Sequence, residues 1–410
     1  MKITIIGSGI SGLGAAMALA STHDVTVFER SPRAGGHTRT TRVVDGDREL
    51  ALDTGFIVHN HANYPLLTGL FDELGVATQP SEMSFSVSAP EEGFEYSPTR
   101  AWRQPALLGG RMAALLAEIV RFTLSGRRYL ATAGPAATLD DLVRSEGYSA
   151  TFRDRYLVPM TAAIWSSGTQ RALEFPAHYA LRFFDNHGLL GPRRHRWRTV
   201  VGGACTYVER IAARLGPRLR LGCPVREVRR DLDGVSVRLA DDRIERFDAA
   251  LLATHADQAL ALLGDADERE RSVLGAFSST ESDTVLHTDE NLLPRAPAAR
   301  ASWNYRLSPR DTHDRPVVTY YLNRLQRIDS DTHYCVSLNQ ADAVDPDRVI
   351  ARIADRHPLY TFESIDAQGR LTGLAGRRRT WFCGAYHGYG FHEDGLASGL
   401  RAAQALQAAA

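Results

Sequence analysis

Lysine is almost missing from this chain of 410 residues. Lys2 is the only lysine, and arginine supplies all the other strongly basic side chains. Together these two residue types number 48, as do aspartate and glutamate, so the formal net charge at pH 7 is zero. A chain without net charge gives no indication of nucleic-acid binding or of bulk electrostatic attraction to membranes. We therefore expect no nucleic-acid partner and do not favour peripheral contact with a membrane.

Cysteine is also scarce, with four scattered residues and no CxxC pair. Such spacing is typical of unpaired, buried thiols in a reducing compartment. No group of histidine, cysteine and carboxylate residues has the spacing of a metal site, so we expect no metal ligands. The four cysteines are Cys205, Cys223, Cys335 and Cys383.

Long apolar runs are missing as well, since none approaches the roughly 18 residues of a membrane-spanning helix. The first residues lead straight into an apolar strand, which leaves no room for a signal peptide, and we expect a cytoplasmic protein. Hydrophobic residues make up 44% and charged residues 23%, which is ordinary for a globular protein. A chain of this length is expected to form two interlaced domains.

The first thirty residues carry the pattern of a βαβ nucleotide-binding unit. An apolar strand at 3–6 leads into a glycine-rich turn at 7–12, followed by a helix at 13–20 and a second strand at 24–29. This second strand ends in the acid Glu29. Both strands, the glycines and the acid have the spacing of a dinucleotide site.

Each conspicuous residue of this unit has a physical task. Gly7 permits a tight turn, Gly9 lets the backbone approach a pyrophosphate, and Gly12 allows the helix to pack closely on the strand. The N–H groups at the helix start suit phosphates, and Glu29 is placed to accept hydrogen bonds from a ribose. The expected cofactor contacts here are Gly7, Gly9, Ile10, Ser11, Gly12 and Glu29.

A second glycine pair, at 35 and 36, follows soon after Glu29 and has no function in a simple NAD domain. The segment resembles the flavin-containing amine oxidoreductase superfamily, whose fingerprint here is RxGGRxxS/T. His37 replaces the usual second arginine, so the resemblance leaves phosphate neutralisation to Arg33 or Arg39. It implies FAD contacts at Arg30, Arg33, Gly35, Gly36, His37, Thr38, Thr54, Gly55 and Phe56.

Two later stretches fit the same resemblance. A strand starting at Val225 precedes a hairpin, and a buried parallel strand is expected at 249–254. In the superfamily the residue matching Val225 contacts adenine through its backbone. The segment 380–399 is similar to the last motif, where a helix N-terminus meets the pyrimidine edge of the flavin, although Ala385 replaces a frequent acid. It implies contacts at Gly384, Glu393, Asp394 and Gly395.

A closer resemblance covers nearly the whole chain. It is to a bacterial family of amine-oxidase-like, predicted NAD/FAD-binding proteins often associated with cyclopropane-fatty-acid synthase-type methyltransferases. Members include flavin-dependent desaturases of methyl-branched fatty acyl chains. The shared motifs lie at 53–58, 83–87, 164–166, 181–188, 197–200, 302–305, 319–323 and 388–395.

The resemblance implies an α/β fold, namely a glutathione-reductase or amine-oxidase-type FAD-binding Rossmann fold with an interleaved α+β substrate domain. We expect a discontinuous FAD-binding domain from 1–85, 196–270 and 370–410, and a substrate domain from 86–195 and 271–369. The first insert should be mainly helical, because apolar residues recur at helical spacing from Leu107 to Phe122.

Two surface features have competing interpretations. The apolar stripe from Leu107 could dock on a membrane, but core packing is favoured. The arginine clusters at 193–196 and 377–379 could bind phosphate, but solvated faces or local ion pairs are favoured. The sequence does not indicate the oligomeric state.

Amine oxidases of the superfamily generally use a lysine to hold a water near the reactive flavin nitrogen. The only lysine, Lys2, lies in the first strand, so no lysine is available to hold this water. Its absence argues against a standard amine oxidase. The candidate catalytic residues are instead His387, His392, Tyr386, Tyr389 and Trp165. For the histidines a structural role remains the alternative, and for Trp165 it is interdomain packing.

We therefore expect an FAD-dependent oxidoreductase with non-covalent FAD. Its substrate would be a small, apolar acyl, lipid or polyketide-like molecule that passes a hydride to the flavin and is dehydrogenated or desaturated. The alternatives are a flavin-dependent double-bond isomerase, an amine oxidase, and a non-catalytic FAD-bound partner of a methyltransferase.

Overall fold

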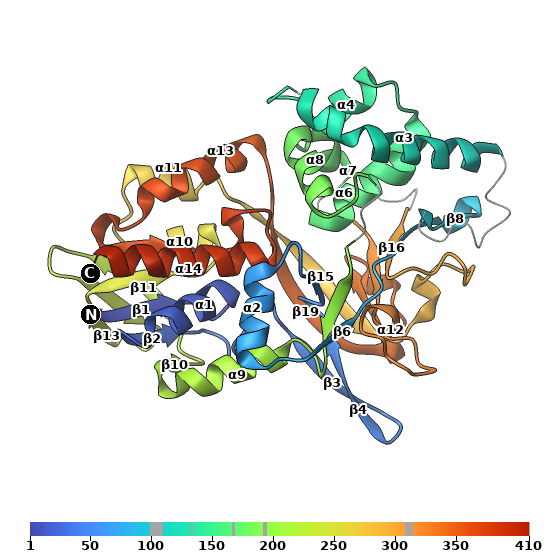
Figure 1. The fold of residues 1–410 in the computed structure, drawn as a ribbon. Helices are drawn as coiled ribbons and strands as arrows, with labels where there is room; N and C mark the ends of the chain where they lie inside the picture. The colour runs from blue at the N-terminus through green and yellow to red at the C-terminus, as the bar shows by residue number, and fades with distance from the viewer. Residues whose placement is uncertain (99–109, 133, 166–168, 192–194, 308–314, 410) are drawn as a thin grey trace.

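The computed structural model describes residues 1–98, 110–132, 134–165, 169–191, 195–307 and 315–409. One half of the molecule, on the left in Figure 1, is built on a five-stranded parallel sheet. Its strand order is β10-β2-β1-β14-β20. The central strands are mostly apolar and buried because both faces of the sheet are covered. They are β1 (Lys2–Ile6), β2 (Asp24–Phe28), β10 (Leu219–Arg220), β14 (Ala249–Leu252) and β20 (Thr380–Phe382).

Alternate residues of these strands face two different cores, as the two-residue period of a strand requires. Ile3 and Ile5 pack under three helices and Ile6 packs on the opposite side. At the crossing of the first and last helices a Cβ on Gly399 would lie 2.1 Å from the Ser11 carbonyl oxygen, so glycine is needed there. The three helices are α1 (Ile10–Leu19), α9 (Cys205–Leu215) and α14 (His392–Ala409), and Figure 1 shows α1 and α14 side by side.

The opposite face carries a three-stranded antiparallel sheet and three helices. Here Arg230, whose side chain is fully buried, pairs with Glu270 and Asp265 at 2.8 Å each. Arg378 also pairs with Asp265, and Arg377 pairs with Asp267 at 3.1 Å, so these arginines of the 377–379 cluster are local ion-pair partners, as favoured from the sequence. The elements are β11 (Val225–Arg230), β12 (Val235–Leu239), β13 (Ile244–Phe247), α10 (Ala256–Leu262), α11 (Glu268–Leu274) and α13 (Phe362–Arg370).

The other half of the molecule contains a seven-stranded sheet in the order β19-β15-β18-β17-β16-β7-β8. Its neighbouring strands are antiparallel except β7 and β16, which run parallel. The long strands β15 and β19 reach from this sheet toward the first half (Figure 1). The strands are β7 (Phe85–Ala89), β8 (Phe94–Tyr96), β15 (Ser279–His287), β16 (Trp303–Arg306), β17 (Val318–Tyr321), β18 (Cys335–Leu338) and β19 (Val349–Pro358).

A helical cap lies above this sheet in Figure 1 and confirms that the first insert is mainly helical. Leu115, Ile119 and Phe122 of its longest helix are buried against the other helices, which confirms core packing for this part of the apolar stripe. Leu107 and Leu108 lie outside the described residues. The cap contains α3 (Gly110–Thr132), α4 (Leu139–Ser145), α5 (Ala150–Phe152), α6 (Val158–Trp165), α7 (Thr169–Glu174) and α8 (Ala177–Asn186).

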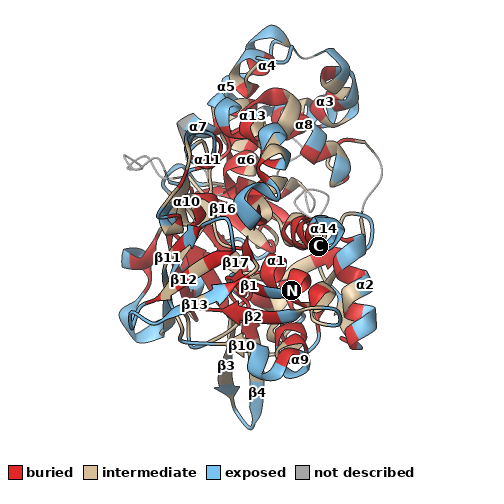
Figure 2. Ribbon diagram, turned by 90° about the vertical axis from the view of Figure 1, so that its left-hand side faces the viewer, coloured by how far each residue is buried: buried red, intermediate tan, exposed pale blue. Residues whose placement is uncertain are grey.

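Short elements connect the two halves. A hairpin of β3 (Thr40–Asp45) and β4 (Arg48–Asp53) projects from the junction, and α2 (Pro65–Leu74) packs beside α9 and α14 (Figure 1). The buried residues run continuously through both halves in Figure 2. A small sheet joins β5 (Val58–Asn60), β9 (Trp197–Val200) and β6 (Thr78–Pro80).

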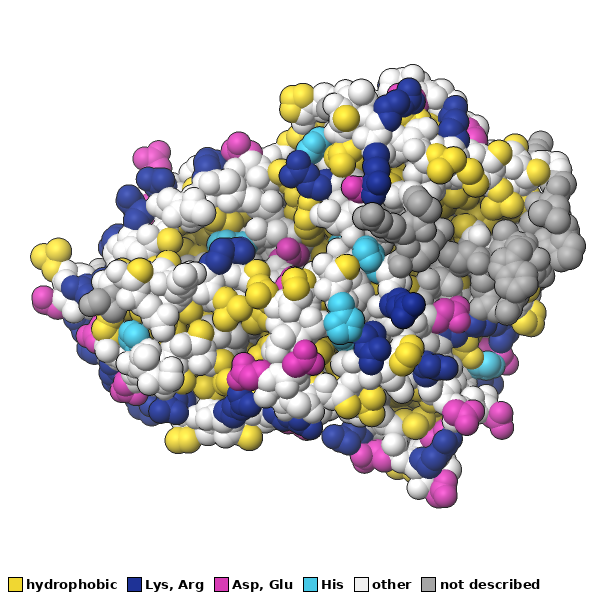
Figure 3. All heavy atoms as spheres, viewed as in Figure 1, with side chains coloured by type: hydrophobic (Ala, Val, Ile, Leu, Met, Phe, Trp, Pro, Cys, Tyr) yellow, Lys and Arg dark blue, Asp and Glu magenta, His cyan; other side chains and the backbone are white. Residues whose placement is uncertain are grey.

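The surface agrees with the zero net charge. On the face in Figure 3 basic and acidic side chains are interspersed. All four cysteines are unpaired, with Cys335 and Cys383 buried and Cys205 and Cys223 partly exposed. Among the described residues, no helix combines the length and the apolar character that crossing a membrane requires.

Candidate active site

The three glycines of the first turn have different surroundings. Gly7 has a φ of +105°, and a Cβ there would lie 2.6 Å from the Ala253 carbonyl oxygen. A Cβ on Gly12 would lie 2.0 Å from the Gly7 carbonyl oxygen, whereas a Cβ on Gly9 would meet nothing within 4 Å. Gly9 therefore borders open space at the start of α1, where the first N–H groups, including those of Ile10 and Ser11, lack intrahelical acceptors. This space and these donors fit a pyrophosphate.

Glu29 is held at the end of β2 by its neighbours. Its carboxylate accepts hydrogen bonds from the Ser8 N–H at 2.9 Å, the Ser8 hydroxyl at 2.7 Å and the Ser31 N–H at 2.8 Å. A carboxylate offers about four acceptor positions, so one remains for a ribose hydroxyl. The Cys223 N–H donates to the Glu29 carbonyl oxygen at 2.8 Å, which brings the strand starting at Val225 close to the acid.

The second glycine pair touches the first glycine turn. The Gly35 N–H donates to the Ser8 carbonyl oxygen at 2.9 Å, and a Cβ on Gly36 would lie 2.9 Å from the Gly9 Cα. Two segments thus meet beside the open space at Gly9, and Gly36 could not carry a larger residue without displacement. The structure brings these two sequence motifs into one site.

The arginines expected to neutralise phosphates are engaged by the protein. Arg33 donates to the carbonyl oxygens of Thr38 and Gly36, both at 2.9 Å, and so braces the glycine loop. Arg39 pairs with Asp355 at 3.7 Å. The side chain of Arg33 therefore shapes the loop, and the described contacts leave the helix N–H groups as the clearest phosphate donors. Arg30 is exposed.

A cavity of about 1330 Å³ lies where the two halves meet. At one end it is bordered by His37, Thr54, Gly55, Phe56 and His392, which come from the motifs matched to the flavin. From there it extends between the seven-stranded sheet and helices α3, α6 and α8. Eleven further aromatic residues line it, namely Tyr64, Phe85, Tyr156, Trp165, Phe183, Trp197, Trp303, Tyr320, Tyr360, Tyr389 and Phe391.

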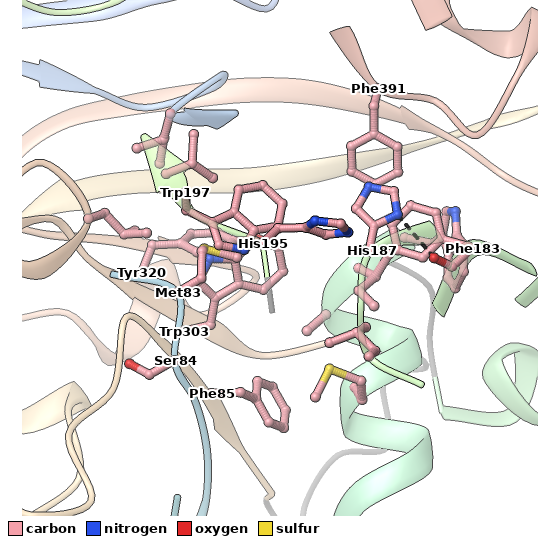
Figure 4. Close-up of a pocket in the computed structure, with 18 of the residues that line it drawn as sticks. Met83, Ser84, Phe85, Phe183, His187, His195, Trp197, Trp303, Tyr320 and Phe391 are labelled. Atoms are coloured by element: carbon pink, nitrogen blue, oxygen red, sulfur yellow. Dashed lines mark hydrogen bonds between the residues drawn. The ribbon is translucent and has the colours of Figure 1, made fainter. Parts of the chain in front are cut away.

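Figure 4 shows how the cavity walls face one another. Trp197, Trp303 and Tyr320 lie on one side, and Phe183 and Phe391 lie on the other. The Trp303 and Tyr320 rings meet edge to face with their centroids 5.0 Å apart, a favourable geometry for neighbouring aromatic rings. These walls suit an apolar ligand.

His187 is an additional cavity histidine, from the end of α8. Its ring stacks on Phe183 with centroids 3.7 Å apart, and Nδ1 donates to the Phe183 carbonyl oxygen at 3.0 Å (Figure 4). Because a carbonyl only accepts, this bond places the proton of the neutral ring on Nδ1. Burial lowers the pKa of His187 to about 4, so the ring is neutral at physiological pH.

His392, a predicted catalytic residue, lines the cavity but is tied to its surroundings. Its Nε2 is 2.8 Å from the Thr38 hydroxyl and 3.1 Å from the Tyr207 hydroxyl, and its ring stacks on Phe56 at 4.0 Å. Burial lowers its pKa to about 3. The side chain therefore fixes the start of α14 against the second glycine segment.

Tyr386 and His387, two of the candidate catalytic residues, do not border the cavity. Tyr386 instead packs in the core on the opposite face of the five-stranded sheet, with its ring centroid 5.1 Å from that of Phe277. Burial lowers the pKa of His387 to about 4. Tyr389 and Trp165 do line the cavity, and Trp165 also packs in the helical cap.

The side chains expected near the pyrimidine edge support the site from outside. Glu393 accepts from the N–H groups of Leu66 at 2.8 Å and Leu67 at 2.9 Å and so caps α2 instead of pointing into the cavity. Asp394 accepts from the Phe391 N–H at 3.0 Å. A Cβ on Gly395 would lie 2.9 Å from Ile10, so this glycine serves helix packing, and the Gly384 N–H is bonded to Ser398.

Sequence reasoning assigned no role to several residues of the cavity. Met83, Phe85, Trp303 and Tyr320 belong to the shared motifs at 83–87, 302–305 and 319–323, and that sharing was the available signal. His357 also lines the cavity, and no motif pointed to it.

Comparison with known proteins agrees with this geometry. The model of the flavin containing amine oxidoreductase family matches residues 10–286. Among solved structures, a variant of putrescine oxidase has a TM-score of 0.72 at 16% identity, covering 100% of this chain and 99% of that one. Cyclohexylamine oxidase from Brevibacterium oxydans has a TM-score of 0.68 at 16% identity, with 100% and 99% covered. A fatty acid isomerase from P. acnes that produces CLA has a TM-score of 0.68 at 18% identity, with 99% and 98% covered.

These likenesses establish the amine-oxidase-like fold, and the family match implies a flavin cofactor and an oxidoreductase activity. The glycine motifs, the open space at Gly9 and the adjoining cavity are the parts of the structure that the family relationship explains. The protein belongs to the flavin-containing amine oxidoreductase family.

Proposed function

We propose that this protein is an oxidoreductase with non-covalently bound FAD that dehydrogenates an apolar acyl, lipid or polyketide-like substrate. The observation that carries the proposal is the cavity of about 1330 Å³ with aromatic walls, which adjoins the residues matched to the flavin. Sites for small molecules are usually apolar clefts of about 300–1,000 Å³ with a few polar groups, and this cavity also has to admit part of the flavin.

The residues of the nucleotide-binding half fit FAD. Gly9 and the start of α1 would hold the pyrophosphate, Glu29 the adenosine ribose, and the segment 54–56 the isoalloxazine end. When bound, the flavin accepts a hydride from the substrate. The protein has to exclude water, orient the reacting C–H bond and manage the proton.

The charges around the cavity do not favour a cationic amine. Its bordering carboxylates include Asp355, which pairs with Arg39 at 3.7 Å, and Glu82, which pairs with Arg324 at 3.2 Å. Both are therefore already compensated by arginine. Lys2 lies far away in β1, where its ammonium group stands 4.6 Å from the centre of the Phe247 ring.

A double-bond isomerase is the second candidate, because the fatty acid isomerase shares the fold and the cavity walls suit an acyl chain. An isomerase leaves the flavin oxidised after each turnover and changes no substrate mass. A dehydrogenase removes two hydrogens and requires an electron acceptor.

The test uses the purified holoprotein. Denaturing release and chromatography should yield FAD in the supernatant, and flavin on the precipitated chain would contradict non-covalent binding. Anaerobic mixing with fatty acyl substrates should bleach the flavin absorbance and give a product lighter by two hydrogens. A product of unchanged mass would identify the isomerase, and no conversion of any lipid would contradict both candidates and favour a non-catalytic role.

A further inference from the structure

A row of polar side chains lies on the otherwise apolar wall of the cavity. Strands β15 and β19 pair antiparallel, with Ser282 opposite Asp355, and alternate residues share a face. Thr284, Asp355 and His357 of this face border the cavity. Arg356 points to the other face, where it pairs with Asp257 at 2.7 Å.

His357 is the member of this row whose side chain can accept a proton. Its Nδ1 is 3.1 Å from the Ser282 hydroxyl, and its ring meets that of His37 edge to face with centroids 5.2 Å apart. No described residue partners its Nε2, so that nitrogen is available to a ligand. The Thr284 hydroxyl, two residues from Ser282, is buried without a partner, a second sign that a ligand or water completes this wall.

His357 stands at the flavin end of the cavity. A Cβ on Gly55 would lie 1.9 Å from the His37 carbonyl oxygen, so the segment in contact with His357 packs directly on the segment 54–56. A substrate that presents a C–H bond to the flavin therefore has its neighbouring carbon near this wall.

The charged and titratable groups around His357 keep it neutral. His37 from the second glycine segment and His255 at the start of α10 both face it, while Asp355 on its own strand is compensated by Arg39. Burial, and then these two imidazoles, lower the pKa of His357 to about 3. The ring is thus an unprotonated acceptor at every physiological pH.

We infer that His357, positioned by Ser282, accepts the proton that the substrate loses during dehydrogenation. The inference rests on the proposed function. One substrate carbon gives up a hydride to FAD, which is the oxidant. The adjacent carbon gives up a proton to Nε2 of His357, and the electron pair of that C–H bond becomes the new double bond. The imidazolium then returns its proton to water after the product leaves.

Three other histidines are less suited. His392 has its Nε2 occupied by two hydroxyl groups, and His387 does not border the cavity. His187 has an open Nε2 but is stacked on Phe183 from the helical side, away from the segment at His37. His357 alone among these four combines contact with the flavin-end segment and an unpartnered nitrogen in the described part of the chain.

The test compares two serine-bonded histidines of the same sheet. The holoprotein variants are His357→Gln, Ser282→Ala and Ser282→Thr. The matched control is His287→Gln, because His287 is fully buried and bonded to the Ser337 hydroxyl at 2.8 Å but does not border the cavity. FAD content, melting temperature and the anaerobic rate of flavin bleaching are measured for each.

We expect His357→Gln to slow bleaching about 100-fold, in the range of general base catalysis, with FAD content unchanged. Ser282→Ala should slow it about 10-fold and Ser282→Thr should restore it, because threonine keeps the hydroxyl. The rate for His287→Gln should equal that of the wild type. Equal rates for His357→Gln and wild type would overturn the inference while leaving the proposed function intact.

A second readout needs no turnover. Ring signals of His357 in the NMR spectrum of the FAD-free protein, assigned with His357→Gln, should shift in Ser282→Ala, because that variant removes the hydrogen bond at Nδ1. Unchanged ring signals in Ser282→Ala would overturn the positioning of His357 by Ser282. If no lipid bleaches the wild-type flavin, the proposed function and this inference both fail.

Discussion

At the scale of single residues, histidine side chains have very different surroundings at different positions of this chain. His357, His387 and His392 are all kept neutral by burial. Only the first has an open nitrogen in the cavity, since the second does not border the cavity and the third is tied to two hydroxyls. A sequence shows which residues could exchange protons, but contacts from distant segments decide which one is placed to do so.

Replacing His387 tests this distinction. The variant His387→Ala should reduce its flavin at a rate within about twofold of the wild type, because the side chain does not border the cavity. Stopped-flow absorbance with an active lipid measures the rate, and FAD content shows that the site is intact. A loss of about 100-fold with full FAD content would restore His387 as the catalytic base.

The contacts of Glu29 give a second prediction. The variant Glu29→Ala removes a charge-assisted hydrogen bond to the ribose, worth about 1.5–3 kcal/mol, and should weaken FAD binding about 10- to 150-fold. Gly9→Val should be worse, because its side chain would enter the open space beside α1. Fluorescence titration of the FAD-free protein measures both affinities. Unchanged affinities would place the ribose and pyrophosphate elsewhere.

At the scale of elements, the sequence was a good guide wherever local physics sufficed. The βαβ unit and the helical first insert appear as predicted, and the parallel strand predicted at 249–254 is found at 249–252, since these elements follow from periodicity and glycine spacing. The motif after β20 also forms a turn and a helix. Its side-chain roles were not predictable, because Glu393 caps a helix that begins at Pro65, far away in the chain.

The start of α14 gives a prediction on stability. Burial raises the pKa of Asp394 from 3.8 to about 6, even though the Phe391 N–H donates to it. The folded state therefore binds a proton more tightly than the unfolded state. The stabilisation this provides is complete below pH 3.8 and is lost as the pH rises through 6.

Asparagine at this position cannot titrate. For the FAD-free protein, the free energy of unfolding of the wild type relative to Asp394→Asn should fall by about 2 kcal/mol between pH 4 and 7. Urea unfolding followed by circular dichroism at several pH values measures this difference. A constant difference, or one that grows with pH, would show that the Asp394 carboxyl is not destabilised by burial.

At the scale of the whole molecule, the site arises where interleaved segments meet. The cavity is bordered by residues of the second glycine segment, the small connecting sheet, the helical cap and the long strands β15 and β19. The sequence indicated two halves and their inserts, but a cavity is a property of their packing. Residues such as Trp303 and His357 acquire their role only when β16 and β19 are brought to the same junction.

A cavity-filling variant tests whether this junction holds the substrate. Ala163 of α6 is buried and borders the cavity, and Ala163→Trp would fill much of the adjoining space. We expect long acyl chains to lose activity most and short ones least, with FAD still bound. Ala172, which is buried in the cap without bordering the cavity, supplies the control Ala172→Trp for general disruption of the helices. Equal activity profiles for wild type and Ala163→Trp would contradict the placement.

We propose that the cavity accepts apolar acyl substrates and not amines. The most direct measurement is the anaerobic rate of flavin bleaching by matched pairs, each a fatty acyl compound and a primary amine with the same carbon chain. We predict that the acyl member of each pair bleaches the flavin faster and that the advantage grows with chain length. Faster bleaching by the amines throughout would contradict the account and identify the protein as an amine oxidase despite its single lysine in β1.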